Sequence, residues 1–385
     1  MPAPLIASHN ILSPLGFSTD ENFSAVRNGK SGLALQASSP TSNTPFCAAL
    51  INTDKLDMAF QAIGNPNKYT RFEKLLILSI SHALKDSEVD IRSGQTGILI
   101  STTKGNIDLL DAENYHGFGE NRIHLWEAAQ QVQAFFENPN VPIVLSNACI
   151  SGALAVIMAS DYIRSGRYNN IVVAGADIIS KFVVSGFQSF LALAENPCQP
   201  YDKNRNGLNL GEGCGTIVLT NNKKAGLDGE LIAVAGGASS NDANHISGPS
   251  RTGAGLTLAI GKSLKNAGIS AGDVNYLCAH GTATIFNDEM ESLAFSTAGL
   301  SATPVNSFKG YYGHTLGAAG LIESVLTVKS MTEKLLVKTA GYTDCGVSGK
   351  INVITENTQA NIHHAMKTAS GFGGCNAALI FSKLS

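Results

Sequence analysis

The sequence predicts an α/β protein with much buried sheet, on three observations. Short runs rich in Val, Ile and Leu are typical of buried strands, and they recur at residues 96–101, 142–148, 170–177, 215–220, 275–281 and 376–382. Stretches with helical periodicity lie between them, at residues 74–86, 151–166, 257–268 and 318–331. Apolar residues make up 44% of the chain, charged residues 15%, and 39 residues are glycine. This composition suits a globular chain with many tight turns and argues against disorder.

The chain has 385 residues, enough for two domains or for one body built from two similar halves. A polar, glycine-containing break at 221–230 follows a predicted strand, so we divide the chain into residues 1–222 and 223–385. The two parts close on similar segments, NLGEGCGTIVLT and SGFGGCNAALIFS. This similarity is consistent with an internal duplication. Chance likeness of two segments that each join a glycine-rich turn to a strand explains it equally well.

Composition and charge exclude several classes of function. No apolar run is long enough to span a bilayer, and the N-terminus lacks the features of a signal peptide. Seven cysteines are scattered without paired spacing, which predicts neither a disulfide framework nor a zinc site and fits a reducing, cytoplasmic compartment. The net charge of -3 gives no global basic field. We therefore expect neither a nucleic-acid partner nor a membrane partner.

Cys149 is the first candidate for chemistry. It follows a predicted strand, and small residues open a helix directly after it. The thiol is thus expected at a helix N-terminus, where the helix dipole lowers a thiol pKa and small neighbours leave room for a substrate. An isolated cysteine is more often a small buried apolar residue, and the strand-to-helix setting alone does not decide between the two.

Two histidines occur in comparable settings. His280 ends a predicted strand, and His314 lies with Lys309 in a glycine-bounded loop before a helix that holds Glu323. A lone histidine after a strand is usually a satisfied polar residue, but α/β proteins gather ligand-binding residues at such strand ends. Other chemistries are less well supported, because the sequence has no GxSxG elbow, no phosphate-binding loop and no HExxH.

Several segments occur in the order that marks elongating β-ketoacyl-acyl carrier protein synthases of the thiolase superfamily. They are SNACISG, QPYDKNRNGLNLGEGCG, AHGTAT with NDEMES, NSFKGYYGHTLGAAG and GFGGCN. With NILSPLG near the start, the chain resembles this Cys-His-His family over almost its whole length. The resemblance implies a five-layered αβαβα fold of two pseudo-duplicated halves and a homodimer with strands paired across the interface.

The resemblance also implies roles for individual residues. Cys149 matches the nucleophile, and His280 and His314 match the histidine pair that Lys309 supports. Phe372 matches the gating phenylalanine, whose N–H completes an oxyanion hole with that of Cys149. The other matches are the pantetheine-binding threonines, a structural acid and an acidic pair expected to support the scaffold: Thr282, Thr284, Glu323, Asp288 and Glu291.

The implied reaction is a decarboxylative Claisen condensation that extends an acyl chain by two carbons. An acyl group moves from acyl carrier protein to the cysteine, malonyl-carrier protein loses carbon dioxide, and the carbanion attacks the thioester. No metal and no organic cofactor are expected, because phosphopantetheine arrives on the carrier protein. An acidic carrier protein needs local positive charge, for which the candidates are Lys68, Arg71, Lys74, Lys203 and Arg205.

The sequence departs from the family at several points. Ala283 stands where glycine or serine is usual, Ser370 stands where an aromatic residue is usual, and residues 104–141 hold an unusual stretch with the only tryptophan. These departures leave open a specialised polyene or polyketide pathway instead of fatty acid synthesis. Two alternatives remain: the active subunit of a heterodimer with a chain-length-factor-like partner, and a coenzyme A-dependent thiolase-like enzyme.

Overall fold

The computed structural model describes residues 3–37, 39, 41–111, 114–115, 117–227, 229–242 and 248–384. Its strands are β1 (Leu5–Leu12), β2 (Ala34–Gln36), β3 (Phe46–Ala49), β4 (Thr96–Ser101), β5 (Ile143–Leu145), β6 (Asn170–Asp177), β7 (Leu210–Gly211), β8 (Gly213–Thr220), β9 (Leu231–Asn241), β10 (Tyr276–Cys278), β11 (Pro304–Asn306), β12 (Leu335–Leu336), β13 (Asn352–Val353), β14 (Thr358–Gln359), β15 (His364–Gly371) and β16 (Cys375–Leu384). Its helices are α1 (Thr19–Arg27), α2 (Thr53–Gln61), α3 (Arg71–Lys85), α4 (Leu125–Phe135), α5 (Ser151–Arg164), α6 (Lys181–Ser189), α7 (Ala254–Ala267), α8 (Ile285–Thr297), α9 (Lys309–Tyr312) and α10 (Ala319–Thr332).

The two parts of the chain repeat one sheet topology. Strands of the first part follow the order β5-β4-β6-β8-β1, and strands of the second part follow β11-β10-β15-β16-β9, with β13 added beside β11. In each sheet the first three strands are parallel and the last two run antiparallel to their neighbours. A shared order and direction of this kind confirms the predicted pseudo-duplication.

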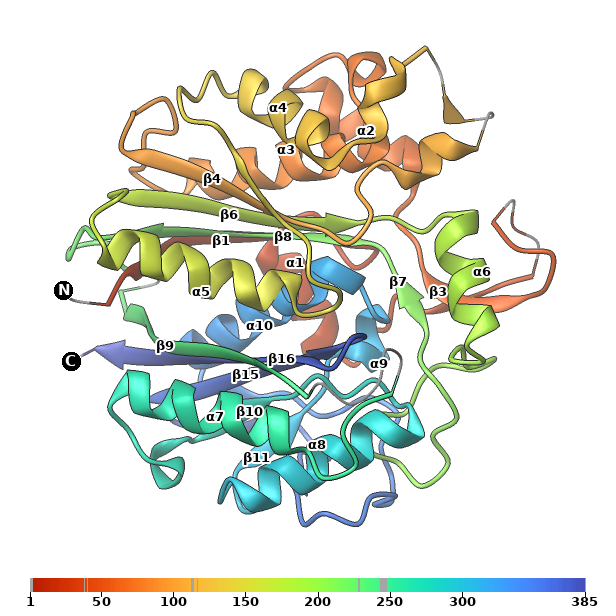
Figure 1. Ribbon diagram of the computed structural model, residues 1–385, viewed down its shortest axis with the longest axis vertical. Coiled ribbons are helices and arrows are strands. Elements are labelled where there is room, and N and C mark those ends of the chain that lie inside the picture. Colours follow the sequence, from red (N-terminus) through yellow and green to blue (C-terminus); the bar gives the residue numbers. More distant parts are fainter. Residues whose placement is uncertain are drawn as a thin grey trace.

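Helices and sheets alternate in layers. Figure 1 shows α5 and α10 between the two sheets, α3 with α2 and α4 on the outer face of the first sheet, and α7 with α8 on the outer face of the second. Helix α3 contacts β1, β6 and β8, α7 contacts β9 and β16, and α10 contacts both β8 and β15. The order of layers is therefore αβαβα, as the resemblance predicts.

Gly152 and Gly320 allow the two central helices to approach closely. A Cβ at Gly152 would lie 2.6 Å from the backbone N of Leu321, and a Cβ at Gly320 would lie 2.5 Å from that of Ala153. Each helix thus needs a glycine in its first turn because the backbone of the other occupies the space. This corrects the expectation that the small residues after Cys149 leave room for a substrate: Gly152 leaves room for α10.

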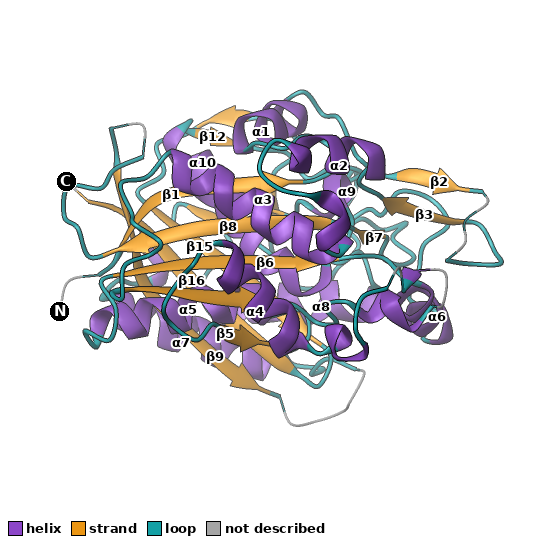
Figure 2. Cartoon of the chain, turned by 90° about the horizontal axis from the view of Figure 1, so that it is seen from above, coloured by secondary structure: helices purple, strands orange, loops and turns teal. Residues whose placement is uncertain are grey.

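Cys149 and His314 occupy equivalent places in the two halves. Cys149 lies between β5 and α5, and His314 lies between β11 and α10. Figure 2 shows α6 and strands β2, β3 and β7 at one end of the molecule, opposite the end where β1 begins and β16 finishes.

In the described part of the chain, no helix is both long and apolar enough to cross a membrane.

Candidate active site

A cavity of about 460 Å³ lies between the two halves, beside α6. Aromatic and aliphatic side chains form most of its wall, among them Phe187, Phe190, Phe286, Met290 and Phe372. Its polar lining includes Cys149, His280, His314, Thr282 and Thr284. A largely apolar cavity with a few converging polar groups suits a ligand that has an apolar chain and one reactive end.

Cys149 sits in a strained turn at this cavity. The preceding residue, Ala148, has a φ of 45°, in the left-handed region that non-glycine residues seldom adopt. Gly371 lies against the turn, since a Cβ there would be 3.0 Å from the backbone N of Cys149. The Phe372 backbone forms a hydrogen bond to the Cys149 sulfur. The two N–H groups predicted for an oxyanion hole therefore lie beside the thiol.

The Cys149 thiol is protonated in the free protein. Burial raises its pKa to about 12, and the nearby Cys375 acts in the same direction. The charge of Lys309 and the Phe372 backbone act in the opposite direction but are outweighed. The expected lowering of this pKa at the helix N-terminus is therefore wrong for the resting state, because burial outweighs the effects that lower it. The thiol must lose its proton when a substrate reacts.

Two carboxylates shape the turn that carries His280. The Glu291 carboxylate accepts the backbone N–H of His280 at 2.9 Å and that of Gly281 at 2.6 Å. Asp288 accepts the backbone N–H of Ala283 at 3.2 Å. Ala283 has a φ of 62°, which explains why a glycine would fit this position easily. The acidic pair thus lies where scaffold support was expected, bound to backbone.

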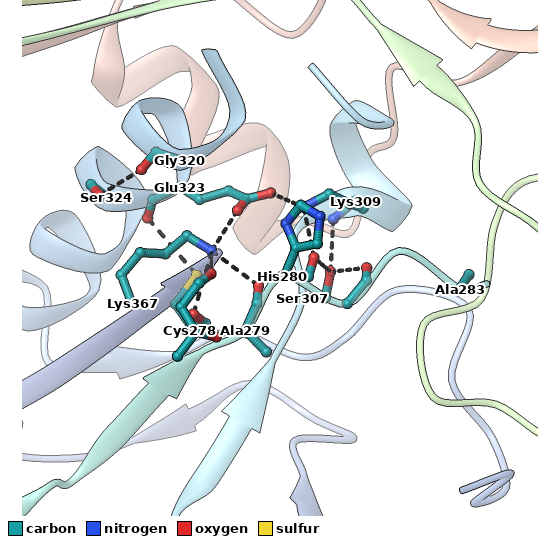
Figure 3. A network of polar contacts seen from close by, with 12 residues as sticks. Cys278, Ala279, His280, Ala283, Ser307, Lys309, Gly320, Glu323, Ser324 and Lys367 are labelled. Atoms are coloured by element: carbon teal, nitrogen blue, oxygen red, sulfur yellow. Dashed lines mark hydrogen bonds and ion pairs between the residues drawn. The ribbon is translucent and has the colours of Figure 1, made fainter. Parts of the chain in front are cut away.

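Lys309 sets the proton position on His280. Its Nζ lies 3.2 Å from His280 Nδ1, 2.6 Å from the His280 carbonyl oxygen and 2.6 Å from Glu323 Oε1 (Figure 3). An ammonium group can only donate, so Nδ1 must accept and the ring proton must be on Nε2. His280 is thereby held as the tautomer that can donate a hydrogen bond from Nε2.

His314 is poised for a ligand. The ring is 1% exposed, and within the described residues neither of its nitrogens has a hydrogen-bond partner. It lies edge-on to His280, with ring centroids 5.1 Å apart. A buried polar group without a partner is costly unless a substrate satisfies it.

Both histidines are neutral. Burial lowers the pKa of His280 and His314 well below the usual value, and the charges of Lys309 and Lys367 add to this effect. Neutral imidazole rings can donate an N–H without repelling a cationic neighbour.

The reactive atoms of Cys149, His280 and His314 converge. One ligating atom from each lies within 4.8 Å of the others. Thiolate and imidazole also suit a soft metal ion, and a bound metal ion would itself deprotonate the thiol. That the three groups act on a substrate and need no metal ion stays a prediction.

The remaining predicted site residues lie around the cavity. Thr282 and Thr284 line it and share a hydrogen bond of 2.8 Å between their hydroxyls. The Phe372 ring is 39% exposed and packs against Phe187 and Phe190, at centroid distances of 5.8 Å and 5.4 Å. The unusual Ser370 also lines the cavity, and its hydroxyl bonds Asn376 at 2.8 Å.

The predicted basic residues differ in their accessibility. Arg71 pairs with Glu212 at 2.6 Å, the buried Lys74 pairs with Asp57, and Arg205 is 9% exposed. These three side chains are buried or partly buried beside acidic residues from other parts of the sequence. For Arg205 the acidic residue is Asp288, at 3.9 Å. Lys68 and Lys203 are exposed, although Lys203 pairs with the exposed Asp344 at 2.8 Å. The predicted basic face at the start of α3 is therefore reduced to Lys68.

Sequence reasoning missed Lys367. This residue is 0% exposed, lies on β15 and forms an ion pair of 2.6 Å with Glu323 Oε2 (Figure 3). Lys367 stands three residues before Ser370, where the predicted glycine-rich segment begins, and this position gives no local sign of burial. The segment around it, HAMKTASG, mixes polar and apolar residues and was not among the predicted strands.

The family model described as Beta-ketoacyl synthase, N-terminal domain matches residues 6–225, and that described as Beta-ketoacyl synthase, C-terminal domain matches residues 231–343. The chain belongs to the β-ketoacyl synthase family. The predicted membership in this family of condensing enzymes is thus confirmed.

Relatives and solved structures agree with the family. The Schizosaccharomyces pombe protein named "Putative 3-oxoacyl-[acyl-carrier-protein] synthase, mitochondrial" is 29% identical, over 98% of this chain and 98% of its own. The ishigamide ketosynthase/chain length factor has a TM-score of 0.89 at 23% identity, with 100% of both chains covered. The ketosynthase ApeO in complex with its chain length factor ApeC, from Xenorhabdus doucetiae, has a TM-score of 0.87 at 25% identity, covering 99% of this chain and 98% of the other. These similarities confirm the thiolase-like fold.

Proposed function

We propose that this β-ketoacyl synthase is a 3-oxoacyl-[acyl-carrier-protein] synthase that joins a cysteine-bound acyl group to a malonyl unit with loss of carbon dioxide. The observation that carries the proposal is the convergence of the Cys149 thiol with two neutral histidines within 4.8 Å, at the wall of a largely apolar cavity. Nucleophile, enolate-stabilising donors and space for an acyl chain then occur together.

Acyl loading is the first half-reaction. The Cys149 sulfur attacks the thioester carbonyl of acyl-carrier protein, the bond to the pantetheine sulfur breaks, and the proton lost by Cys149 ends on the departing thiol. The N–H groups of Cys149 and Phe372 would bind the oxyanion that forms, each typically worth about 3 kcal/mol. His280 carries its proton on Nε2 and accepts from Lys309 at Nδ1, so His314 is the histidine that can take the thiol proton.

Decarboxylation is the second half-reaction. Malonyl-carrier protein binds with its thioester oxygen towards the N–H groups of His280 and His314, and carbon dioxide leaves to give an enolate. The neutral rings stabilise the enolate by donating to its oxygen, and Lys309 keeps His280 in the donating tautomer. The enolate carbon then attacks the acyl thioester, the bond to Cys149 breaks, and the released thiolate takes up a proton.

The cavity provides places for the rest of the substrate. Thr282 and Thr284 are proposed to bind the pantetheine arm, since their hydroxyls line the cavity beside His280. Phe372 is proposed to act as the gate between the thiol and the apolar cavity, because its ring contacts Phe187 and Phe190 there. Glu323, Asp288 and Glu291 are proposed to support the site.

Acyl carrier protein is the proposed partner. Its acidic surface would meet the exposed Lys68 and Lys203. The Lys203 side chain is 57% exposed, pairs with the exposed Asp344 at 2.8 Å and lies near the cavity-lining Asn206 in the sequence. The phosphopantetheine would arrive on this partner, so no separate cofactor is proposed. The free thiols and the absence of disulfides in the described residues support a cytoplasmic location. We keep the proposed boundary between residues 222 and 223, between β8 and β9.

A dimer is proposed through the edge of the first sheet. Strand β5 ends the strand order and carries no partner on its outer side in the described chain. Val141 and Trp126 nearby are 81% and 51% exposed. An unpaired edge with apolar neighbours is a suitable surface for strand pairing with a second subunit. A heterodimer is the alternative, supported by the similarity to ApeO, which occurs in complex with a chain length factor.

The proposal is tested by mixing the protein with acyl-carrier protein and malonyl-carrier protein and weighing the products by mass spectrometry. We expect 3-oxoacyl-carrier protein, two carbons longer, and one carbon dioxide released per condensation. The same reaction is run with the matching coenzyme A thioesters in place of the carrier-protein substrates. Condensation that occurs only with coenzyme A would establish the thiolase-like alternative instead.

A further inference from the structure

A second buried lysine lies behind the histidine pair. Lys367 Nζ forms its ion pair with Glu323 Oε2, and it also donates to the carbonyl oxygens of Ala279 at 3.2 Å and Cys278 at 3.5 Å. These two carbonyls belong to the residues directly before His280. Lys367 therefore fixes the end of β10 from one side while it orients the Glu323 carboxylate from the other.

Glu323 is shared by two cations. Its Oε1 lies 2.6 Å from Lys309 Nζ and its Oε2 lies 2.6 Å from Lys367 Nζ (Figure 3). Both lysine side chains are 0% exposed, and the Glu323 side chain is 5% exposed. One carboxylate cannot neutralise two ammonium groups, so the cluster of Lys309, Glu323 and Lys367 carries one excess positive charge.

Other titratable groups around Lys367 do not cancel this charge at the histidines. Glu291 lies across the turn after β10, where its oxygens accept the N–H groups of His280 and Gly281. Cys278 faces Lys367 from β10 with a thiol whose pKa burial raises, so it stays neutral. Burial is the largest single effect on Lys367 and opposes its charged form, but Glu323, Cys278 and Glu291 together outweigh burial and raise the pKa of Lys367. The lysine is therefore charged at neutral pH.

We propose that Lys367 is a positioning residue for decarboxylation: by sharing Glu323 with Lys309, it keeps one excess positive charge beside His280 and His314, so that both rings remain neutral N–H donors. The inference rests on the proposed function, because the donors matter only if an enolate forms. Lys367 is not one of the residues that line the cavity, and it acts through Glu323 and the backbone before His280.

The charge makes a prediction about pH. Protonation of either histidine adds a positive charge next to an existing one, so the cluster holds the histidine pKa down. Without the charge of Lys367, the histidines take up protons at higher pH. The acid limb of the pH profile of decarboxylation should then shift to higher pH, by on the order of one pH unit.

The experiment uses the full chain with Cys149→Gln, whose amide imitates an acylated thiol and removes the titration of the thiol. Carbon dioxide release from malonyl-carrier protein is measured as kcat/KM across pH. Lys367→Met and Lys367→Gln both remove the charge, and Gln keeps a donor for Glu323. We expect the acid limb to move up in both. Lys367→Met combined with Glu323→Gln restores one net positive charge, on Lys309, and should return the limb towards the parent position.

Lys329→Met is the matched control. Lys329 is a buried lysine of α10 that pairs with Glu333 and Asp20, outside this cluster. The acid limb of the pH profile of the Lys329→Met variant should lie at the same pH as that of the parent protein. A folded Lys367→Gln enzyme whose rate falls equally at every pH, with an unmoved limb, would overturn the inference. A parent that releases no carbon dioxide would contradict the proposed function instead, so the two failures are distinguishable.

Discussion

Lys309 Nζ lies 3.2 Å from Nδ1 of His280, and this contact fixes which nitrogen of the histidine carries the proton. Because the ammonium donates, Nε2 keeps its proton and can donate to a substrate oxygen. His314, edge-on to His280, brings a second ring without protein partners in the described structure. Two neutral donors and one thiol thus surround a single point.

The histidine pair should separate the two half-reactions. His280→Ala and His314→Ala each remove one donor to the enolate, so decarboxylation should fall about 100-fold or more, while acyl loading of Cys149 should fall much less. Carbon dioxide release and acyl-enzyme formation are followed separately in each variant. If a histidine variant decarboxylates malonyl-carrier protein at the normal rate, that histidine does not stabilise the enolate.

Lys309→Met should act through the tautomer of His280. Without the ammonium group, Nδ1 of His280 can take the proton, so part of the population loses its Nε2 donor. We expect slower decarboxylation with a nearly unchanged KM for malonyl-carrier protein, because ground-state binding does not need that donor. A large rise in KM with an unchanged kcat would instead indicate a role for Lys309 in binding.

Gly371→Ala should disturb the oxyanion site without touching a side chain that reacts. The new Cβ would lie 2.9 Å from Cys375 Sγ and 3.0 Å from the backbone N of Cys149. One of these must move, and we expect acyl loading to slow by about 10-fold to 100-fold. Gly261→Ala is the control, because a Cβ there meets nothing within 4 Å. Equal loading rates in the two variants would contradict the proposed oxyanion site.

The protonated thiol predicts a distinctive pH dependence of alkylation. The thiolate is the reactive form, and an ordinary cysteine has a pKa of about 8.5. Because burial raises the pKa of Cys149 to about 12, its reaction with iodoacetamide should still accelerate above pH 9. Peptide mass spectrometry gives the rate at Cys149 alone. A rate that levels off below pH 8 would show that the thiol is activated in the free enzyme.

Much of the fold could be predicted because its central strands are apolar runs. Residues 96–101 and 170–177 coincide with β4 and β6. Strand β9 was missed because only its first half is apolar, while glycine and serine fill most of the second half. A Cβ at Gly236 would lie 2.5 Å from the carbonyl oxygen of Ser263 in α7. Close packing of a helix on a strand removes the side chains by which a strand is predicted.

The site residues also fall into some that could be predicted from the sequence and some that could not. Cys149, His280, His314, Lys309 and Glu323 stand in recognisable segments, and the structure brings all five together. Lys367 was missed because its partner Glu323 comes from another element, and the pKa of Cys149 was misjudged because a helix terminus is local whereas burial depends on the whole fold. Arg71 and Lys74 were placed on the surface for the same reason, since their partners Glu212 and Asp57 lie elsewhere in the sequence.

The central claim is that Cys149 carries the acyl chain. Intact-mass spectrometry of the purified protein and of Cys149→Ala, after incubation with a panel of acyl-carrier proteins and matching coenzyme A thioesters, tests it most directly. We predict a mass increase equal to one acyl group from acyl-carrier protein on the native chain and none on the variant. An adduct of equal size on Cys149→Ala, or none on the native chain with any donor, would contradict the account.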